Sequence, residues 1–380
     1  MENYLNKRVT QIELSGIRKF FNMVSEFEDV ISLTIGQPDF KTPLHIKEAA
    51  KQAIDEDFTV YTHNAGFLEL RKAAADYVKE KYRLTYDPAS EVIVTAGASE
   101  AIDISLRTIL SEGDEAILPG PVYPGYEPIV RLSGGVPVHA DITGNSFKMT
   151  AGIISAYITE KTKCIILPYP SNPTGVSLNA QELREIAALV QDKGIFIIAD
   201  EIYSELSYEG HASIAEFLPA QTILINGLSK SHSMTGWRIG FIFAPGRIAE
   251  HILKVHQYNV SCASSISQKA AYAALTAGFN DAAPMRAEYR KRRDYVYSRL
   301  KEMNLDVVMP DGAFYFFIKL PKKYPSSEEF ALELLKSKRV ALVPGSAFSQ
   351  LGEGYVRLSY AYSLDTLERA LDRLASFLDT

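Results

Sequence analysis

The sequence predicts an α/β protein, with a mostly parallel, doubly wound seven-stranded sheet in a large domain and a smaller α+β domain beside it. Between residues 91 and 243, seven short apolar runs alternate with stretches of helical periodicity. Continuous apolar runs are typical of strands covered on both faces, and strand–helix alternation favours a parallel sheet. The predicted strands span residues 92–95, 115–118, 136–139, 164–167, 196–199, 222–225 and 239–243.

The length of 380 residues exceeds what one hydrophobic core usually supports, so we expect two domains. We place an N-terminal arm and part of the small domain in residues 1–45, the large domain in 46–283, and the rest of the small domain in 284–380. A composition of 47% hydrophobic and 23% charged residues indicates an ordered globular chain.

Helical periodicity predicts the elements around these strands. Asn179, followed by Glu182 three residues later, resembles a capping box at the start of a helix over residues 179–191. After residue 283 the pattern looks antiparallel, which predicts the α+β part, completed by an N-terminal strand at 31–35. Further helices are predicted at 47–55, 68–82, 284–303, 327–336 and 364–378, and further strands at 312–318, 340–343 and 355–359.

Composition also excludes several function classes. The net charge of -6 disfavours nucleic acid as the main partner. Cys164 and Cys262 have no partner at metal-ligand spacing, so we expect free thiols in a reducing compartment and no metal site. The N-terminus shows no signal-peptide core and no run of about 18 apolar residues occurs, so we expect a cytoplasmic protein with no membrane partner.

Ligands of a doubly wound sheet collect beyond the carboxyl ends of its strands, so the residues there are candidates for a site. After the first strand, Ala98 and Ser99 follow Gly97 and open a helix, whose free N–H groups and dipole suit a phosphate. The same residues are compatible with a tight turn in which Ser99 is only the N-cap. After the second strand, Tyr123 stands in a proline-rich loop, where its ring either covers a flat ligand or caps the sheet.

Two further strand ends carry polar side chains. Asn172 stands among prolines, an arrangement that either positions its amide for a ligand or is ordinary turn chemistry. Asp200 ends an apolar run, where a carboxylate must be paired or solvated because burying it alone is costly. Tyr203 follows three residues later and brings a phenol to the same strand end.

The stretch from residue 226 to 240 surrounds Lys230 with small residues and adds Arg238, whose planar charged fork suits an anion. A strand followed by a loop with an ordinary surface lysine is an equally good interpretation of this stretch alone. Together, however, the strand ends supply a lysine, an acid, a phenol, an amide and a turn whose free N–H groups suit a phosphate. A pyridoxal 5'-phosphate site needs those groups, because the lysine binds the aldehyde covalently and the acid keeps the ring nitrogen protonated.

These residues resemble the fold-type I, pyridoxal-phosphate-dependent aminotransferases of class I/II, and the resemblance covers essentially the whole chain. The stretch 227–240 matches the cofactor-lysine signature of the family closely. The resemblance implies that Lys230 binds the cofactor, that Asp200 pairs with its ring nitrogen, and that Tyr203 bonds its phenolic oxygen. Further cofactor contacts implied in this way are Ala98, Ser99, Tyr123, Asn172, Arg238 and, from the partner subunit, Tyr61.

The resemblance also concerns the substrate and the assembly. It implies that Arg357, assisted by Asn172 and the backbone of Gly36, binds the substrate α-carboxylate. It implies a homodimer with shared active sites. The chain departs from the best-known pattern at Gly227, where several relatives carry a phosphate-binding serine, and at Tyr123, which replaces a frequent tryptophan.

The activity implied is ping-pong transfer of an amino group from an L-amino acid to a 2-oxo acid, which we expect to be 2-oxoglutarate. Segments 36–39, 168–175 and 256–268 resemble bacterial members that act on N-acetyl-L,L-diaminopimelate in lysine biosynthesis. Two alternatives remain open, an aromatic or aspartate-type aminotransferase and a β-lyase on the same fold. The segment 260–265 lacks the arginine with which one aspartate aminotransferase subgroup binds the distal carboxylate. A cofactor-sensing regulator would need a DNA-binding appendage, for which we find no room in the N-terminal residues.

Recognition of the distal end of the substrate is the least determined feature. Arg18 and Arg107 are candidates by rough position, although solvated or helix-paired arginines explain both equally well. Ile17, Tyr61 and Tyr123 would line an apolar pocket if the substrate were aromatic.

Overall fold

The computed structural model describes residues 1 and 4–379. Its large sheet contains seven strands in the order β2-β8-β7-β6-β5-β3-β4, so each of the seven predicted apolar runs forms a strand. This architecture confirms the predicted α/β class. The strands are β2 (Val92–Thr95), β3 (Glu115–Gly120), β4 (Val136–Asp141), β5 (Thr162–Leu167), β6 (Phe196–Asp200), β7 (Thr222–Gly227) and β8 (Gly240–Phe243).

One strand of the large sheet runs against the others. β8 pairs antiparallel with both β2 and β7, whereas β3, β4, β5, β6 and β7 pair in parallel. Parallel neighbours need a long crossover, but the connection from β7 to β8 holds only the one-turn helix α9 (Leu228–Ser231) and a 3-10 turn, η6 (Thr235–Trp237). This short connection carries Lys230 and Arg238.

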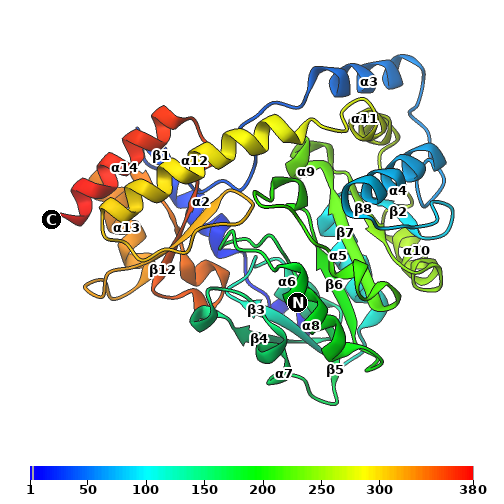
Figure 1. The fold of residues 1–380 in the computed structure, drawn as a ribbon, viewed down its shortest axis with the longest axis horizontal. Helices are drawn as coiled ribbons and strands as arrows, with labels where there is room; N and C mark the ends of the chain where they lie inside the picture. The colour runs from blue at the N-terminus through cyan, green and yellow to red at the C-terminus, as the bar shows by residue number, and fades with distance from the viewer. Residues whose placement is uncertain (2–3, 380) are drawn as a thin grey trace.

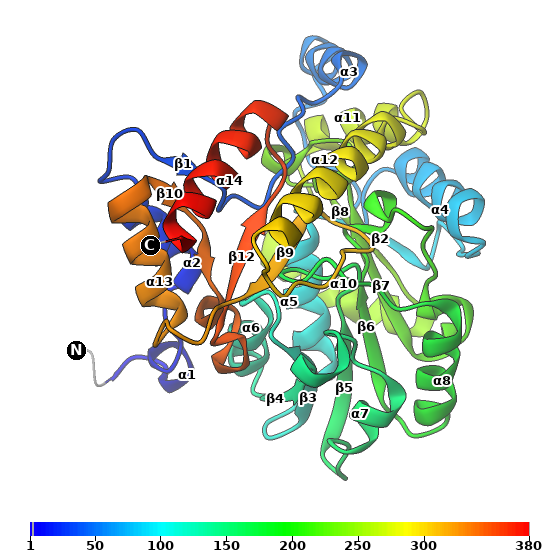
Figure 2. The same ribbon diagram turned by 60° about the vertical axis from the view of Figure 1, so that its left-hand side comes forward.

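Helices cover both faces of the sheet (Figures 1 and 2). Along β5 the side chains alternate between two buried clusters, with Ile165 and Leu167 in one, and Cys164 and Ile166 in the other. This alternation explains why the strands are apolar throughout. The first cluster includes residues of α4 (Leu68–Tyr82), α7 (Ala151–Ser155), α8 (Ala180–Val190) and α11 (Ser265–Leu275), and the second includes residues of α5 (Ala98–Ile109), α6 (Tyr126–Leu132) and α10 (Gly246–Val260).

The smaller sheets share a third buried cluster with helices α12 (Ala282–Glu302), α13 (Ser327–Lys338) and α14 (Leu364–Leu378). Strands β9 (Tyr315–Lys319), β12 (Tyr355–Ser359) and β11 (Val343–Pro344) form an antiparallel sheet. The N-terminal strand β1 (Ile31–Ser32) joins this group as predicted, but it is shorter than the predicted strand at 31–35 and pairs in parallel with β10 (Val340–Ala341). The single strand predicted at 340–343 is divided between two sheets, and the domain boundaries after residues 45 and 283 stay predictions.

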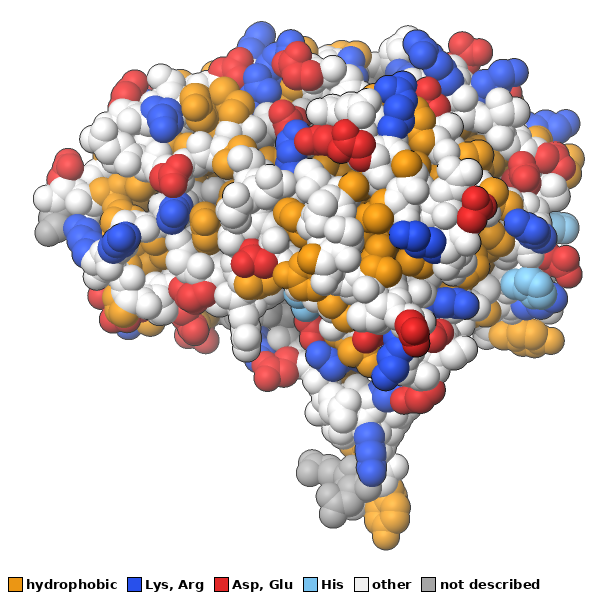
Figure 3. Space-filling model, turned by 60° about the horizontal axis from the view of Figure 1, so that its bottom comes forward, with side chains coloured by type: hydrophobic (Ala, Val, Ile, Leu, Met, Phe, Trp, Pro, Cys, Tyr) orange, Lys and Arg blue, Asp and Glu red, His pale blue; other side chains and the backbone are white. Residues whose placement is uncertain are grey.

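Local helix signals are confirmed where they are strongest. Asn179 and Glu182 form the predicted capping box at the start of α8. The segment predicted as an N-terminal arm contains helices α1 (Lys7–Thr10) and α2 (Gly16–Val24), and α3 (Leu44–Asp55) follows β1. None of the helices within residues 1 and 4–379 is both long and apolar enough to cross a membrane. Figure 3 shows acidic and basic side chains interspersed on one face of the molecule.

Candidate active site

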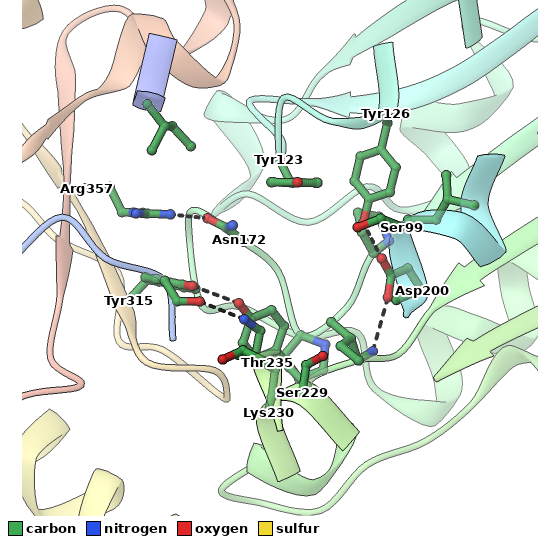
Figure 4. Close-up of a pocket in the computed structure, with 18 of the residues that line it drawn as sticks. Ser99, Tyr123, Tyr126, Asn172, Asp200, Ser229, Lys230, Thr235, Tyr315 and Arg357 are labelled. Carbon is green, nitrogen blue, oxygen red and sulfur yellow. Dashed lines mark hydrogen bonds between the residues drawn. The ribbon is translucent and has the colours of Figure 1, made fainter. Parts of the chain in front are cut away.

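The ends of β5, β6 and β7 and the start of α5 face β12 of the small sheet across a cavity of about 320 Å³ (Figure 4). All but one of the predicted site residues line this cavity. Residues from three predicted groups, at the strand ends, near Lys230 and in the C-terminal part, therefore meet in one place. The predicted residues that line it are Gly36, Ala98, Ser99, Tyr123, Asn172, Asp200, Tyr203, Lys230, Arg238 and Arg357.

One end of the cavity is arranged for an anion. Gly97 is the N-cap of α5 and has a φ of 92°, so Ala98 and Ser99 form the first helical turn, where N–H groups lack intrahelical acceptors. The alternative interpretation of Ser99 as the N-cap is therefore wrong. A Cβ atom on Gly97 would lie 2.5 Å from Nη2 of Arg238, so only glycine lets this guanidinium lie against the turn. Arg238 also donates through Nη1 to the carbonyl of Thr235 at 3.0 Å.

Asp200 is the last residue of β6 and is 6% exposed. The hydroxyl of Tyr126 donates to its Oδ2 at 2.7 Å, and the N–H of Ile202 donates to its Oδ1 at 3.2 Å. Burial raises the pKa of the Asp200 carboxyl, and these two donors oppose that shift. The hydrogen bonds to its two oxygens thus orient the carboxylate, which lines the cavity.

Lys230 lies on the one-turn helix α9. Its Nζ donates to the carbonyl oxygen of Gly36 at 2.7 Å. Removal from water and the positive charge of Arg357 together lower the pKa of Lys230 to about 8, although Asp200 opposes the shift. Near pH 7, far more of this amine is therefore neutral than for an ordinary lysine, and the neutral form is the one that acts as a nucleophile or a base.

Arg357 lies in the middle of β12 and is 1% exposed. Its Nη1 donates to Oδ1 of Asn172 at 2.8 Å, and its Nη2 donates to the carbonyl of Thr34 at 2.5 Å. Its Nε is buried without a hydrogen-bond partner, and no carboxylate in the described residues forms an ion pair with it. A buried charge in this state is costly and indicates a site for an anionic ligand such as a carboxylate.

The cavity contains two further tyrosines that sequence reasoning missed as site residues. Tyr126 binds Asp200, as described above, and packs edge-on against Tyr123 with ring centroids 5.5 Å apart. Tyr315 is fully buried, and its hydroxyl lies 2.7 Å from that of Tyr203. For Tyr315 the only signal in the sequence is its place in the aromatic run 314–317, because a buried hydroxyl needs a partner.

Several predicted positions lie outside the cavity. Tyr61 is 84% exposed and borders a different hollow, next to Tyr258. Arg18 is exposed and Arg107 pairs with Asp103 at 2.9 Å on α5, and neither lines the cavity. Both arginines therefore match the interpretation of solvated or helix-paired side chains. Ile17 and Tyr123 line the cavity, but Tyr61 does not, so only part of the predicted apolar pocket is present within one chain.

Comparison with known proteins gives a consistent result. The family model described as aminotransferase class I and II matches residues 28–374. A Bacillus subtilis protein named "Probable N-acetyl-LL-diaminopimelate aminotransferase" is 62% identical over 379 residues, which cover 100% of this chain and 96% of that protein. Aromatic-amino-acid aminotransferase 2 of Thermococcus litoralis is 40% identical over 98% of both chains. The structure of Thermus thermophilus aspartate aminotransferase with maleate superposes with a TM-score of 0.93 at 34% identity, covering 98% of this chain and 99% of the other.

Proposed function

The chain belongs to the class I and II aminotransferases, which depend on pyridoxal phosphate, and from this premise we propose that it moves the amino group of N-acetyl-L,L-diaminopimelate to 2-oxoglutarate. The family establishes the transfer of amino groups, so the proposal concerns the substrate pair and its place in lysine biosynthesis. The observation that carries it is the 62% identity, over the whole chain, to a relative of that name.

The side chains around the cavity fit pyridoxal phosphate. The turn at Gly97 has no room for a Cβ atom beside Arg238, and a lysine of lowered pKa and an oriented carboxylate face the same space. We propose that Lys230 binds the aldehyde carbon and that Asp200 faces the ring nitrogen. The other residues that we propose to hold the cofactor are Ala98, Ser99 and Arg238 at the phosphate, Tyr123 at the ring, and Asn172 and Tyr203 at the phenolic oxygen.

When bound, the cofactor supplies an electron sink for the negative charge that develops on the substrate α-carbon. We propose that Arg357 binds the α-carboxylate, assisted by Asn172 and Gly36. Once the donor's amine has displaced it from the aldehyde carbon, Lys230 is free to remove the α-proton, a role that its pKa of about 8 supports. Asp200 keeps the ring nitrogen protonated, because its carboxylate is directed at the cavity by Tyr126 and Ile202.

Charge in the cavity does not by itself select the amino donor. Within the described residues, the only guanidinium groups that line it belong to Arg238 and Arg357, which we assign to the phosphate and to the α-carboxylate. Aspartate and the proposed acceptor 2-oxoglutarate both carry a second carboxylate close to the reacting carbon, whereas a diaminopimelate carries it at the far end of a seven-carbon chain. Since the cavity must accept 2-oxoglutarate, the choice of donor rests on the 62% identity to the relative named above.

A panel of amino donors with 2-oxoglutarate, ranked by kcat/KM, tests the proposal. We expect N-acetyl-L,L-diaminopimelate to exceed aspartate and phenylalanine by at least about tenfold, the value of a single well-placed interaction. A preference for phenylalanine or aspartate would contradict the proposal. It would indicate an aromatic-amino-acid or aspartate aminotransferase, the activities named for the relatives at lower identity.

The β-lyase alternative is separated in the same preparation. Transamination needs an acceptor 2-oxo acid and forms glutamate, whereas β-elimination releases pyruvate and ammonia without an acceptor. We expect product only when 2-oxoglutarate is present. Pyruvate and ammonia formed from a donor with a β-leaving group in its absence would contradict this expectation.

We also propose a cytoplasmic homodimer in which Tyr61 of one subunit reaches the phosphate of its partner. Tyr61 and Tyr258 are 84% and 88% exposed and border the same hollow. Large exposed aromatic side chains that lie together are a common feature of surfaces that bind another protein. This arrangement supports a role for Tyr61 outside the cavity of its own chain.

A further inference from the structure

Tyr315 lies between the part of the cavity that contains Lys230 and the part that contains Arg357 (Figure 4). It is the first residue of β9 and is fully buried. Its hydroxyl lies 2.7 Å from the hydroxyl of Tyr203, and Cζ of Arg357 lies 4.5 Å from the centroid of its ring. A Cβ atom on Gly36 would approach its hydroxyl oxygen to 2.5 Å. Tyr315 therefore touches residues that we assign to both the cofactor and the substrate.

In the hydrogen bond between the two phenols, either hydroxyl can be the donor. Burial raises the pKa of both Tyr203 and Tyr315, so both keep their protons at neutral pH. A phenol donates one hydrogen bond and accepts others. If the proton of Tyr203 is directed to the cofactor, the proton between the two oxygens has to come from Tyr315.

We propose that Tyr315 is a positioning residue with two separable parts, a hydroxyl that donates to Tyr203 and a ring that holds the guanidinium of Arg357. The hydroxyl directs the single proton of Tyr203 to the phenolic oxygen of the cofactor. The guanidinium lies over the face of the ring, a geometry in which aromatic rings attract cations. This inference rests on the proposed roles of Tyr203 and Arg357.

A second pair of tyrosines provides a matched control. The hydroxyls of Tyr208 and Tyr360 lie 2.9 Å apart, and both residues belong to the same buried cluster as Tyr203 and Tyr315. Neither lines the cavity. Tyr360→Phe therefore removes a buried hydrogen bond between phenols without changing a residue of the proposed site.

The hydroxyl is tested by Tyr315→Phe, which keeps the ring. The readout is the pH titration of the visible absorption of the lysine-bound cofactor. A donor to the phenolic oxygen stabilises the form that has lost a proton, because that form places more negative charge on the oxygen. Loss of the Tyr315 donor weakens, but does not remove, the bond from Tyr203, so the midpoint should rise by about 0.1 to 0.5 pH unit, the size expected for the cooperative part of one hydrogen bond. The other charged groups near Tyr203, namely Asp200, Lys230 and Arg357, are unchanged in this variant.

The ring is tested by Tyr315→Leu, with Tyr315→Met made beside it so that a folding failure of one variant leaves a second. We expect KM for the amino donor to rise about 3- to 30-fold in these variants, the range for a buried contact between a cation and an aromatic ring. It should change less than about twofold in Tyr315→Phe. Tyr360→Phe should leave both the titration midpoint and KM unchanged.

Each result decides one statement. A titration midpoint that stays in place in Tyr315→Phe, or moves equally in Tyr360→Phe, overturns the role of the hydroxyl. An unchanged KM in the variants without the ring overturns the support of Arg357. Failure of the unaltered protein to develop the visible absorption on addition of pyridoxal phosphate would contradict the proposed function itself, which separates the two failures.

Discussion

The two halves of the cavity are built in different ways. The half from the large sheet places Asp200 at the end of β6 and Lys230 just after β7, so both arrive at one edge of the sheet by topology. The half from the small sheet places Arg357 within β12, opposite Phe317 of β9 and Val343 of β11. The position of the first half follows from the order of the strands, and that of the second half follows from the pairing register of individual strands.

The halves also differ in their charged groups. Asp200 and Lys230 are titratable, and burial shifts the pKa of each towards the neutral form. Arg357 is a permanent cation that is held by neutral acceptors, Asn172 and the carbonyl of Thr34. We therefore expect changes in the first half to act on chemistry and changes in the second half to act on binding of the substrate carboxylate.

Lys230→Ala gives the largest expected effect and tests this division most directly. The variant lacks both the covalent anchor and the base, so kcat for transamination should fall by more than about 10³-fold. Donor binding, measured by equilibrium titration, should persist because Arg357 is retained.

Lys301→Ala is a suitable control, because Lys301 is exposed on the surface. It should keep the activity of the unaltered protein. A Lys230→Ala protein that transaminates at the unaltered rate would remove Lys230 from the mechanism. Loss of donor binding in the same variant would contradict the division between the two halves.

Arg357→Lys gives an intermediate effect on the second half. The substitution keeps a positive charge but loses the planar fork that holds Asn172 and is directed at a carboxylate. We expect kcat/KM to fall about 10- to 100-fold, mostly through KM, as for the loss of one charged hydrogen bond. Steady-state kinetics with the best donor measures this. Arg107→Lys on α5 is the matched control, and an equal loss there would show that the effect is not specific to the cavity.

The difference between the halves also explains how far the sequence predicts the site. Lys230, Asp200 and Asn172 were predictable because each follows an apolar run, and doubly wound sheets bring such ends together. Tyr315 was not, since it stands in a run of aromatic residues that looks like core, and its role depends on which strands β9 pairs with.

Arg357 was predictable only in part, because the resemblance to the family identified it and the spacing of residues in the sequence did not. The antiparallel direction of β8 was also missed, since an apolar run carries no information about its direction. Tyr61 stays a prediction, because its proposed contact involves a second subunit.

The smallest expected effect concerns the charge through which the two halves influence each other. The positive charge of Arg357 lowers the pKa of Lys230, which lies at about 8. Below that pKa the amine is protonated and has no lone pair, so the rate of pyridoxal phosphate uptake by the apoprotein should rise with pH to a plateau, with its midpoint near 8.

Arg357→Gln should move the midpoint upward, because a charge that disfavours the ammonium form is gone. Arg357→Lys, which keeps that charge, should leave it near 8. Rapid-mixing absorption measurements across pH 6 to 10 distinguish these outcomes, and equal midpoints in all three proteins would show that the halves act independently.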